Sequence, residues 1–186
     1  LNMGRICRRL NEYNTTRDYY KQAQVIQQEI SNRAQEAETL DEMGALAAAE
    51  GDYEKALELH KQAIEIQHSV GNQRREGIAL INLGEVYNLL AKPDAAIEQF
   101  SRALTIFRAM DDLRHAAVAL EGIARAEEKR GSLANARKYI EESLAMRKQI
   151  ALHDVDRKPA ADQRRQRRHE EAGRRLRRPA RALGRQ

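Results

Sequence analysis

The sequence is poor in the residues that build many kinds of site and core. Its 186 residues include one cysteine, three prolines, two phenylalanines and no tryptophan. A single cysteine, Cys7, excludes both an internal disulfide and a cysteine metal cluster. One third of the residues are charged. This composition favours a thin helical array packed by Ala and Leu over a sheet sandwich.

Long apolar runs are also missing. No stretch approaches the roughly 20 apolar residues of a membrane span, and no secretory signal is visible. We therefore expect a cytoplasmic protein that does not enter the membrane. The chain begins at Leu1 rather than Met, and its first repeat starts partway through. We interpret it as a fragment of a longer array.

The excess of positive charge lies in one segment. The whole chain has 33 Lys or Arg against 28 Asp or Glu, a net of +5. Residues 154–186 contain 12 basic and 5 acidic residues, a net of +7, which leaves 21 basic and 23 acidic residues, a net of −2, in 1–153. This division predicts a repeat body over 1–153 and an Arg-rich tail over 154–186, disordered or partly helical.

A period of 40 residues runs through the body. Gly4, Gly44 and Gly84 occupy the same phase, which Ala124 takes in the last copy. Further matched positions are Leu40, Leu80 and Leu120; Ala56, Ala96 and Ala136; and Tyr20, His60, Phe100 and Ile140. A fixed period with one size class at each phase indicates a repeat array.

Turn signals about every 20 residues divide each repeat into two helices, A and B. In the second unit, Gly51 suits a left-handed helix end and Asp52 suits an N-cap; Ser132 is the N-cap expected in the fourth unit. The expected units are 1–32, 33–72, 73–112 and 113–152. The expected helices are about 1–10, 16–30, 33–50, 53–70, 73–90, 93–110, 113–130 and 133–152. The fold class is therefore all-α.

Glycine in mid-helix needs a reason, because it costs about 1 kcal/mol relative to Ala. Close approach of helix A to its own helix B provides one. We expect the alanines Ala56, Ala96 and Ala136 to be the small partners across that contact, with Leu83 and Phe100 on either side.

The third unit carries a family resemblance. Leu83-Gly84-x-x-Tyr87, followed by Ala96-x-x-x-Phe100 and Ala103, resembles the tetratricopeptide repeat. The resemblance implies a right-handed α-solenoid of about four antiparallel helix pairs. The unit is 40 residues instead of the usual 34, which resembles the long repeats of kinesin light chains and of bacterial regulators. The fourth unit fits less well, with Ala124 and Glu127 at the Gly and Tyr positions.

The same resemblance implies a concave groove lined by helix A at fixed offsets from the glycine. Its expected lining is Asn2, Arg5, Glu38, Asp41, Ile78, Ile81, Asn82, Glu85, Asn88, Glu121, Arg125 and Glu128. Asn2 and Asn82 stand at a phase where related repeats hold a peptide backbone, since an amide both donates and accepts hydrogen bonds. The alternative for each exposed residue is a solvated helix face. Mixed charge along the lining predicts a partner segment of mixed charge.

The sequence contains no complete catalytic or metal-binding motif. No Gly-rich phosphate loop follows a strand. Glu65 and His68 have the spacing of a di-iron ligand pair, but the matching positions 40 residues on are Thr105 and Arg108. His60 is interpreted as a core residue. We predict no enzyme, no metal and no cofactor.

The tail supports a second hypothesis. Two clusters of four arginines suit nucleic acid or an acidic partner: Arg164, Arg165, Arg167 and Arg168; and Arg174, Arg175, Arg177 and Arg178. The alternatives are a solvating end, a cap over the last repeat, and a translated shifted reading frame.

The favoured function is a non-enzymatic protein–protein interaction module, part of a larger regulatory or scaffold protein, that binds a peptide or helix in its groove. The alternative is a nucleic-acid-associated protein that binds through the tail. Because each unit needs a neighbour to cover its face, the open ends of the array also predict self-association.

Overall fold

The computed structural model describes residues 1–10 and 12–153. Every regular element in these residues is a helix. The seven labelled helices are α1 (Asn2–Arg9), α2 (Tyr13–Glu29), α3 (Arg33–Glu50), α4 (Tyr53–Ser69), α5 (Gln73–Leu89), α6 (Pro93–Ala109) and α7 (Leu113–Lys129). A further helical segment covers 133–153. The first compact unit of the chain is Leu1–Arg147, and the description below concerns this unit.

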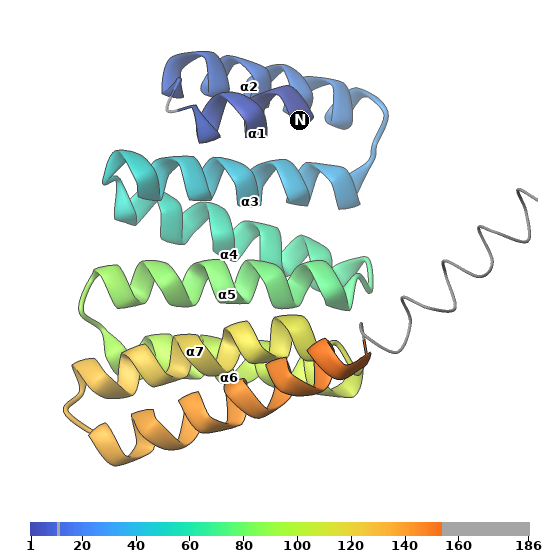
Figure 1. The fold of residues 1–186 in the computed structure, drawn as a ribbon. Helices are drawn as coiled ribbons and strands as arrows, with labels where there is room; N and C mark the ends of the chain where they lie inside the picture. The colour runs from blue at the N-terminus through green and yellow to red at the C-terminus, as the bar shows by residue number, and fades with distance from the viewer. Residues whose placement is uncertain (11, 154–186) are drawn as a thin grey trace, which may run out of the picture. The chain divides into compact units, whose positions relative to one another are not determined.

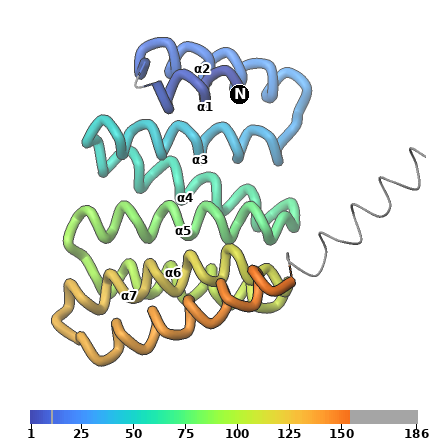
Figure 2. Tube along the Cα trace, in the orientation of Figure 1, coloured from blue at the N-terminus to red at the C-terminus, as the bar shows by residue number. Residues whose placement is uncertain are grey.

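The helices of the first unit form antiparallel pairs that stack in chain order (Figures 1 and 2). Each helix contacts the next one along the chain, and α3 also contacts α5 as α5 contacts α7. Helices α1, α3, α5 and α7 are the A helices of the repeat. This arrangement confirms the all-α class expected from the turn spacing and the solenoid of helix pairs that the family resemblance implies.

The turns follow the local sequence. Gly51, Gly71 and Gly131 have φ of 85°, 70° and 84°, in the left-handed region that favours glycine. The Asp52 carboxylate accepts a hydrogen bond from the Lys55 N–H at 3.2 Å, which confirms the predicted N-cap.

The second helix begins three residues earlier than predicted. It starts at Tyr13 instead of Thr16. The prediction makes Thr16 the first residue of this helix. Both its N–H and its hydroxyl instead donate to the Glu12 carbonyl, at 2.9 and 2.8 Å, so Thr16 lies within the first helical turn.

The repeated glycines do face helix B, but their closest neighbours are rings and not the predicted alanines. A Cβ on Gly84 would lie 2.9 Å from the Phe100 ring, and one on Gly44 would lie 2.8 Å from the His60 ring. Gly4 faces Tyr20 in the same way. The glycine therefore makes room for one large, fully buried side chain from helix B.

Phe100 links two units. Its ring packs on Gly84 of its own unit and on Gly122 of the next, and it is completely buried. In the fourth unit the glycine is replaced by Ala124, and the ring position is held by Ile140, which is 40% exposed. The last helix pair therefore has no buried ring at this position.

Candidate partner-binding groove

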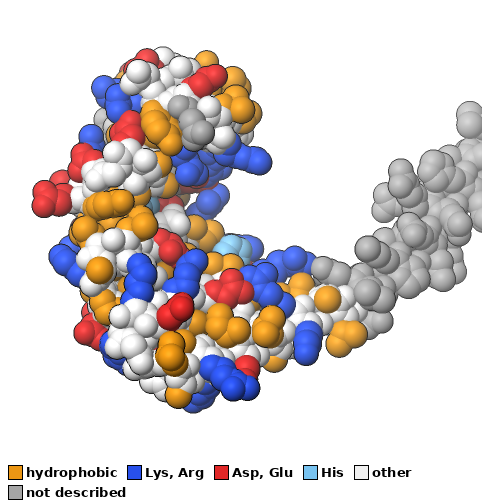
Figure 3. Space-filling view, turned by 60° about the vertical axis from the view of Figure 1, so that its left-hand side comes forward, with side chains coloured by type: hydrophobic (Ala, Val, Ile, Leu, Met, Phe, Trp, Pro, Cys, Tyr) orange, Lys and Arg blue, Asp and Glu red, His pale blue; other side chains and the backbone are white. Residues whose placement is uncertain are grey.

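The A helices share one side of the unit. In Figure 1, α1, α3, α5 and α7 lie toward the viewer. After the 60° turn of Figure 3 this side faces right, where the surface is hollowed and carries basic and acidic side chains together. Contacts between successive A helices fit this placement, because helices on the inner side of a curved stack come closest to each other.

Most of the predicted lining residues retain exposed surface on these helices. Asn2, Arg125 and Glu128 are exposed. Arg5, Glu38, Asp41, Ile78, Asn82, Glu85 and Glu121 are partly exposed. The expectation of an open position is wrong for Ile81 and Asn88, which are both buried. Whether any of these residues binds a partner stays a prediction.

Asn88 is turned toward the next unit. It is 4% exposed, and its amide nitrogen lies 3.5 Å from the Gly122 carbonyl oxygen. The Asn88 carbonyl accepts a hydrogen bond from Lys129 Nζ at 2.5 Å. The Asn88 side chain therefore points between successive A helices and joins α5 to α7. Ile81 is buried because it belongs to the central apolar cluster.

Between the first two units, arginines on α1 meet carboxylates on α3. Arg5 pairs with Glu38, and Arg5 Nε donates to Glu42 Oε1 at 2.6 Å. Arg8 also reaches Glu42, at 3.2 Å. Partial burial of both partners makes these charge-assisted bonds stronger than an exposed pair. They hold the charged side chains in place where the groove passes from the first unit to the second.

Between the second and third units, a polar chain links three helices. Asn82 Nδ2 of α5 donates to Asp41 Oδ2 of α3 at 2.9 Å. The other Asp41 oxygen lies 2.7 Å from Nδ1 of His60 of α4. His60 is 1% exposed, which agrees with its interpretation as a core residue. One N–H of the Asn82 amide, the group expected to hold a peptide, is thus already engaged within the protein.

Between the third and fourth units, Glu85 pairs with Arg125. Burial raises the pKa of Glu85 above that of an ordinary carboxyl group, although Arg125 and Lys129 pull it down. In the fourth unit, Glu121 accepts hydrogen bonds from Ser143 Oγ at 2.9 Å and from Arg147 Nε at 2.7 Å. Charged side chains therefore follow the hollow face through all four units.

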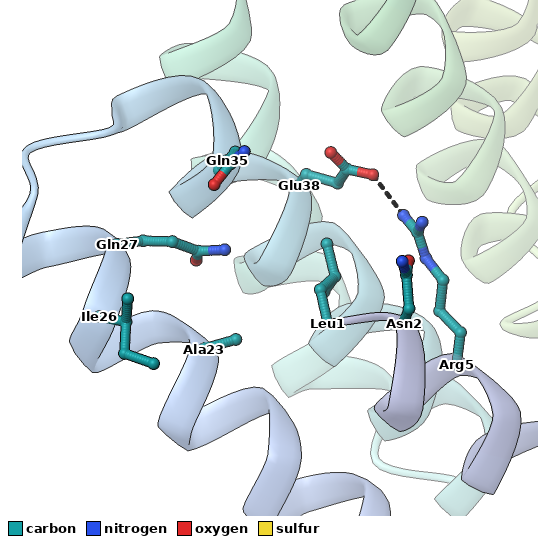
Figure 4. Close-up of a pocket in the computed structure, with 8 residues that line it drawn as sticks. All are labelled: Leu1, Asn2, Arg5, Ala23, Ile26, Gln27, Gln35 and Glu38. Atoms are coloured by element: carbon teal, nitrogen blue, oxygen red, sulfur yellow. Dashed lines mark hydrogen bonds and ion pairs between the residues drawn. The ribbon is translucent and has the colours of Figure 1, made fainter.

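A pocket of about 370 Å³ brings three predicted residues together at the N-terminal end. Asn2 and Arg5 of α1 face Glu38 of α3 across it, and α2 supplies the opposite wall (Figure 4). The α2 wall consists of Ala23, Ile26 and Gln27. Such a pocket offers an amide, a guanidinium and a carboxylate beside an apolar wall.

Sequence reasoning missed several side chains of this surface. Glu42 was not among the expected lining residues, yet it accepts hydrogen bonds from Arg5, Arg8 and the Tyr20 hydroxyl. Arg147 was also missed. The Glu42 contacts join residues at different offsets in neighbouring units, so the 40-residue period gave no signal for them.

Other predicted features lie elsewhere. The eight arginines of the two clusters in the tail fall outside the described residues. Within the part of the chain that the structure describes, no group of three or more His, Cys, Asp or Glu side chains is placed to hold a metal ion. No helix in that part is long and apolar enough to cross a membrane.

Comparison with known structures supports the fold. BtubC (BKLC) from P. vanneervenii superposes with a TM-score of 0.72 at 16% identity, over 80% of this chain and 62% of that chain. The chain thus spans less than two thirds of that relative. The TPR domain of Arabidopsis FLU gives a TM-score of 0.60 at 24% identity, over 63% of this chain and 98% of that domain. At these identities the likeness concerns the fold alone.

The sequence itself decides the family. No curated protein matches the chain. The family model of the tetratricopeptide repeat matches residues 1–69, 35–109 and 75–149, so its three overlapping matches run through the whole repeat body. Proteins of this family generally act through protein–protein interaction and without catalysis. The chain belongs to the tetratricopeptide repeat family.

Proposed function

We propose that the chain is a non-enzymatic interaction module that binds a segment of a partner protein along its hollow A-helix face. The observation that carries this proposal is the continuous series of charged side chains on that face. Arg5, Glu85 and Arg125 are each partly open to solvent while a neighbouring unit holds them in place.

Fixed side chains favour recognition, because a side chain that is already ordered loses less entropy when a ligand binds. Both signs of charge occur along the face, so the partner segment carries both signs as well. Apolar surface at Ile78 adds a contact for an aliphatic side chain. Such a module suits a regulatory or scaffold protein, in which binding is the function.

The test exchanges charges without removing the ion pair. The double variant Glu85→Arg with Arg125→Glu keeps an acid facing a base but reverses their order on the groove. The matched control, Arg137→Glu with Glu141→Arg, does the same for an exposed pair at 2.8 Å on the helical segment 133–153. Both variants should unfold at nearly the wild-type Tm.

The three proteins are used to capture partners from a lysate of the source cells, and the eluates are compared by mass spectrometry. We expect a protein that the wild type and the control retain and the groove variant loses at least tenfold. Equal retention by all three proteins would contradict recognition through the groove.

The tail supports a separate proposal, which rests on sequence alone. Two clusters of four arginines can neutralise phosphates in a salt-dependent, sequence-independent manner. Nucleic acid in the same eluates, lost when the arginines of both clusters are replaced by Gln, would support it.

A further inference from the structure

We propose that a pocket between the second and third units binds a free aliphatic α-amino acid. The pocket has a volume of about 250 Å³ and is lined by side chains of α4, α5 and α6. The first unit precedes these helices and the fourth follows them, so neither end of the described chain shapes the pocket. None of its residues belongs to the predicted groove lining, and the inference does not depend on the groove proposal.

One wall of the pocket is apolar. Ile64 of α4 and Leu83 of α5 line it. They are 8% and 3% exposed and belong to the central apolar cluster, which holds them in place. The pocket is smaller than the roughly 300–1,000 Å³ of sites that take drug-sized ligands. It therefore suits a small molecule with an aliphatic group and is too small for a large cofactor.

A buried amide forms part of the polar wall. Gln99 of α6 is 7% exposed, and its amide oxygen accepts a hydrogen bond from Arg102 Nη1 at 3.0 Å. Among residues 1–10 and 12–153, no acceptor bonds to its amide nitrogen. At the same phase the other units carry Tyr19, Leu59 and Tyr139, so the packing of the repeat does not require an amide here. Since a buried donor without a partner is unfavourable, we infer that a ligand supplies the acceptor.

Three charged side chains complete the polar wall. Lys61 and Glu65 are exposed and lie one helical turn apart on α4, and Arg102 lines the pocket from α6. Within the part of the chain that the structure describes, Lys61 and Glu65 form no ion pair. The two cations and the amide nitrogen of Gln99 can hold a carboxylate. The Glu65 carboxylate can hold an ammonium group.

An aliphatic α-amino acid combines these features in one small molecule. Its carboxylate and its ammonium group are attached to the same carbon, and residues one turn apart on a helix are neighbours. Lys61 and Glu65 can therefore meet the two groups of one ligand through charge-assisted hydrogen bonds, while its side chain lies on Ile64 and Leu83. A carboxylic acid without the amine would leave Glu65 unpaired, and an amine without the carboxylate would leave the two cations unpaired.

Isothermal titration calorimetry of the full chain tests the class of ligand with four probes. These are leucine; isocaproate, which lacks the amine; isoamylamine, which lacks the carboxylate; and N-acetylleucine, which imitates the end of a polypeptide. We expect leucine to bind and each of the other three to bind at least tenfold more weakly. A chain that does not bind leucine would overturn the proposal. Equal binding of N-acetylleucine would also overturn it, because the pocket would then suit the end of a partner protein.

Variants that remove one charge locate the site. Glu65→Gln should weaken leucine binding at least tenfold and leave isocaproate binding unchanged, since only leucine has an ammonium group. Arg102→Gln should weaken the binding of both. The matched control is Glu54→Gln, at an exposed position on the same helix outside the pocket; it should bind leucine as the wild type does.

A fourth variant fills the polar wall. Gln99→Leu introduces the residue that the second unit has at this phase, Leu59, and should abolish leucine binding. Circular dichroism checks that each variant folds, and the exposed positions of Glu65 and Arg102 keep the test valid if Gln99→Leu does not. Leucine binding that is equal in Glu65→Gln, Arg102→Gln and the control would place the ligand elsewhere and overturn the proposal.

Discussion

The packing of Phe100 against Gly122 predicts that the effect of Gly122→Ala on stability reverses when the Phe100 ring is removed. Alanine in place of a helical glycine stabilises an unobstructed helix by about 1 kcal/mol. At Gly122, however, three carbons of the Phe100 ring lie within 3.0 Å of the position that a Cβ would take, closer than real Cβ atoms approach. On its other side the ring packs on Gly84, where an added Cβ would lie 2.9 Å from it, so the ring is held between the two helices.

The expected magnitudes follow from this geometry. Overpacking a filled core costs about 1–3 kcal/mol, so Gly122→Ala should destabilise the protein by roughly 1 kcal/mol once the helix gain is subtracted. Phe100→Ala alone should cost about 3–5 kcal/mol. In that background the obstruction is gone, and Gly122→Ala should stabilise by about 1 kcal/mol.

Urea unfolding of the wild type, the two single variants and the double variant measures the four free energies of unfolding. The predicted coupling between the two sites is roughly 2 kcal/mol. Equal m-values across the four proteins serve as the control for a common unfolding transition. If Gly122→Ala stabilises by the same amount in both backgrounds, the close approach of α7 to Phe100 is not what limits this position.

Four further predictions concern the turns, the buried polar groups and the tail. Ala91 has φ of 53°, so Ala91→Gly should raise the free energy of unfolding by about 0.5–1 kcal/mol in urea melts; a lower value would contradict strain at this turn. Burial raises the pKa of Tyr20 to about 12, against about 10 in an unfolded chain. Since the unfolded state then loses its proton first, stability should fall as pH rises from 10 to 12, and more steeply than in Tyr20→Phe; parallel curves would refute this. Asp41→Ala should cost about 1–3 kcal/mol by leaving His60 without its partner, and adding His60→Phe should restore much of the lost Tm; no recovery would argue against the pairing. Binding of the full chain to double-stranded DNA should weaken steeply with salt and vanish when 154–186 are deleted, whereas binding by the remaining body would exclude the tail as the cause.

The sequence predicted the fold well because its strongest signals are periodic. Glycine at one phase and turn residues every 20 positions locate the helix pairs, and helix ends such as that at Asp52 follow from local capping. The start of α2 was missed because Thr16 can either cap a helix or bond back to a carbonyl within its first turn.

The site was predicted less well, because exposure depends on the neighbouring unit. Asn88 carries the same offset that leaves Glu128 exposed, yet the Gly122 carbonyl and Lys129 of the next helix enclose it. The role of Glu42 likewise depends on Arg5 and Arg8, which lie more than 30 positions away along the chain. Offsets within one repeat cannot report contacts between repeats.

The central claim, that a partner lies along the hollow A-helix face, is tested most directly by site-specific photocrosslinking of the full chain in source-cell lysate. A benzophenone amino acid replaces Glu128 on α7 in one protein and Glu58 on α4, on a B helix, in the other; both positions are exposed. The account predicts that one partner protein crosslinks through position 128 and not through position 58. A partner that crosslinks only through position 58 would contradict it.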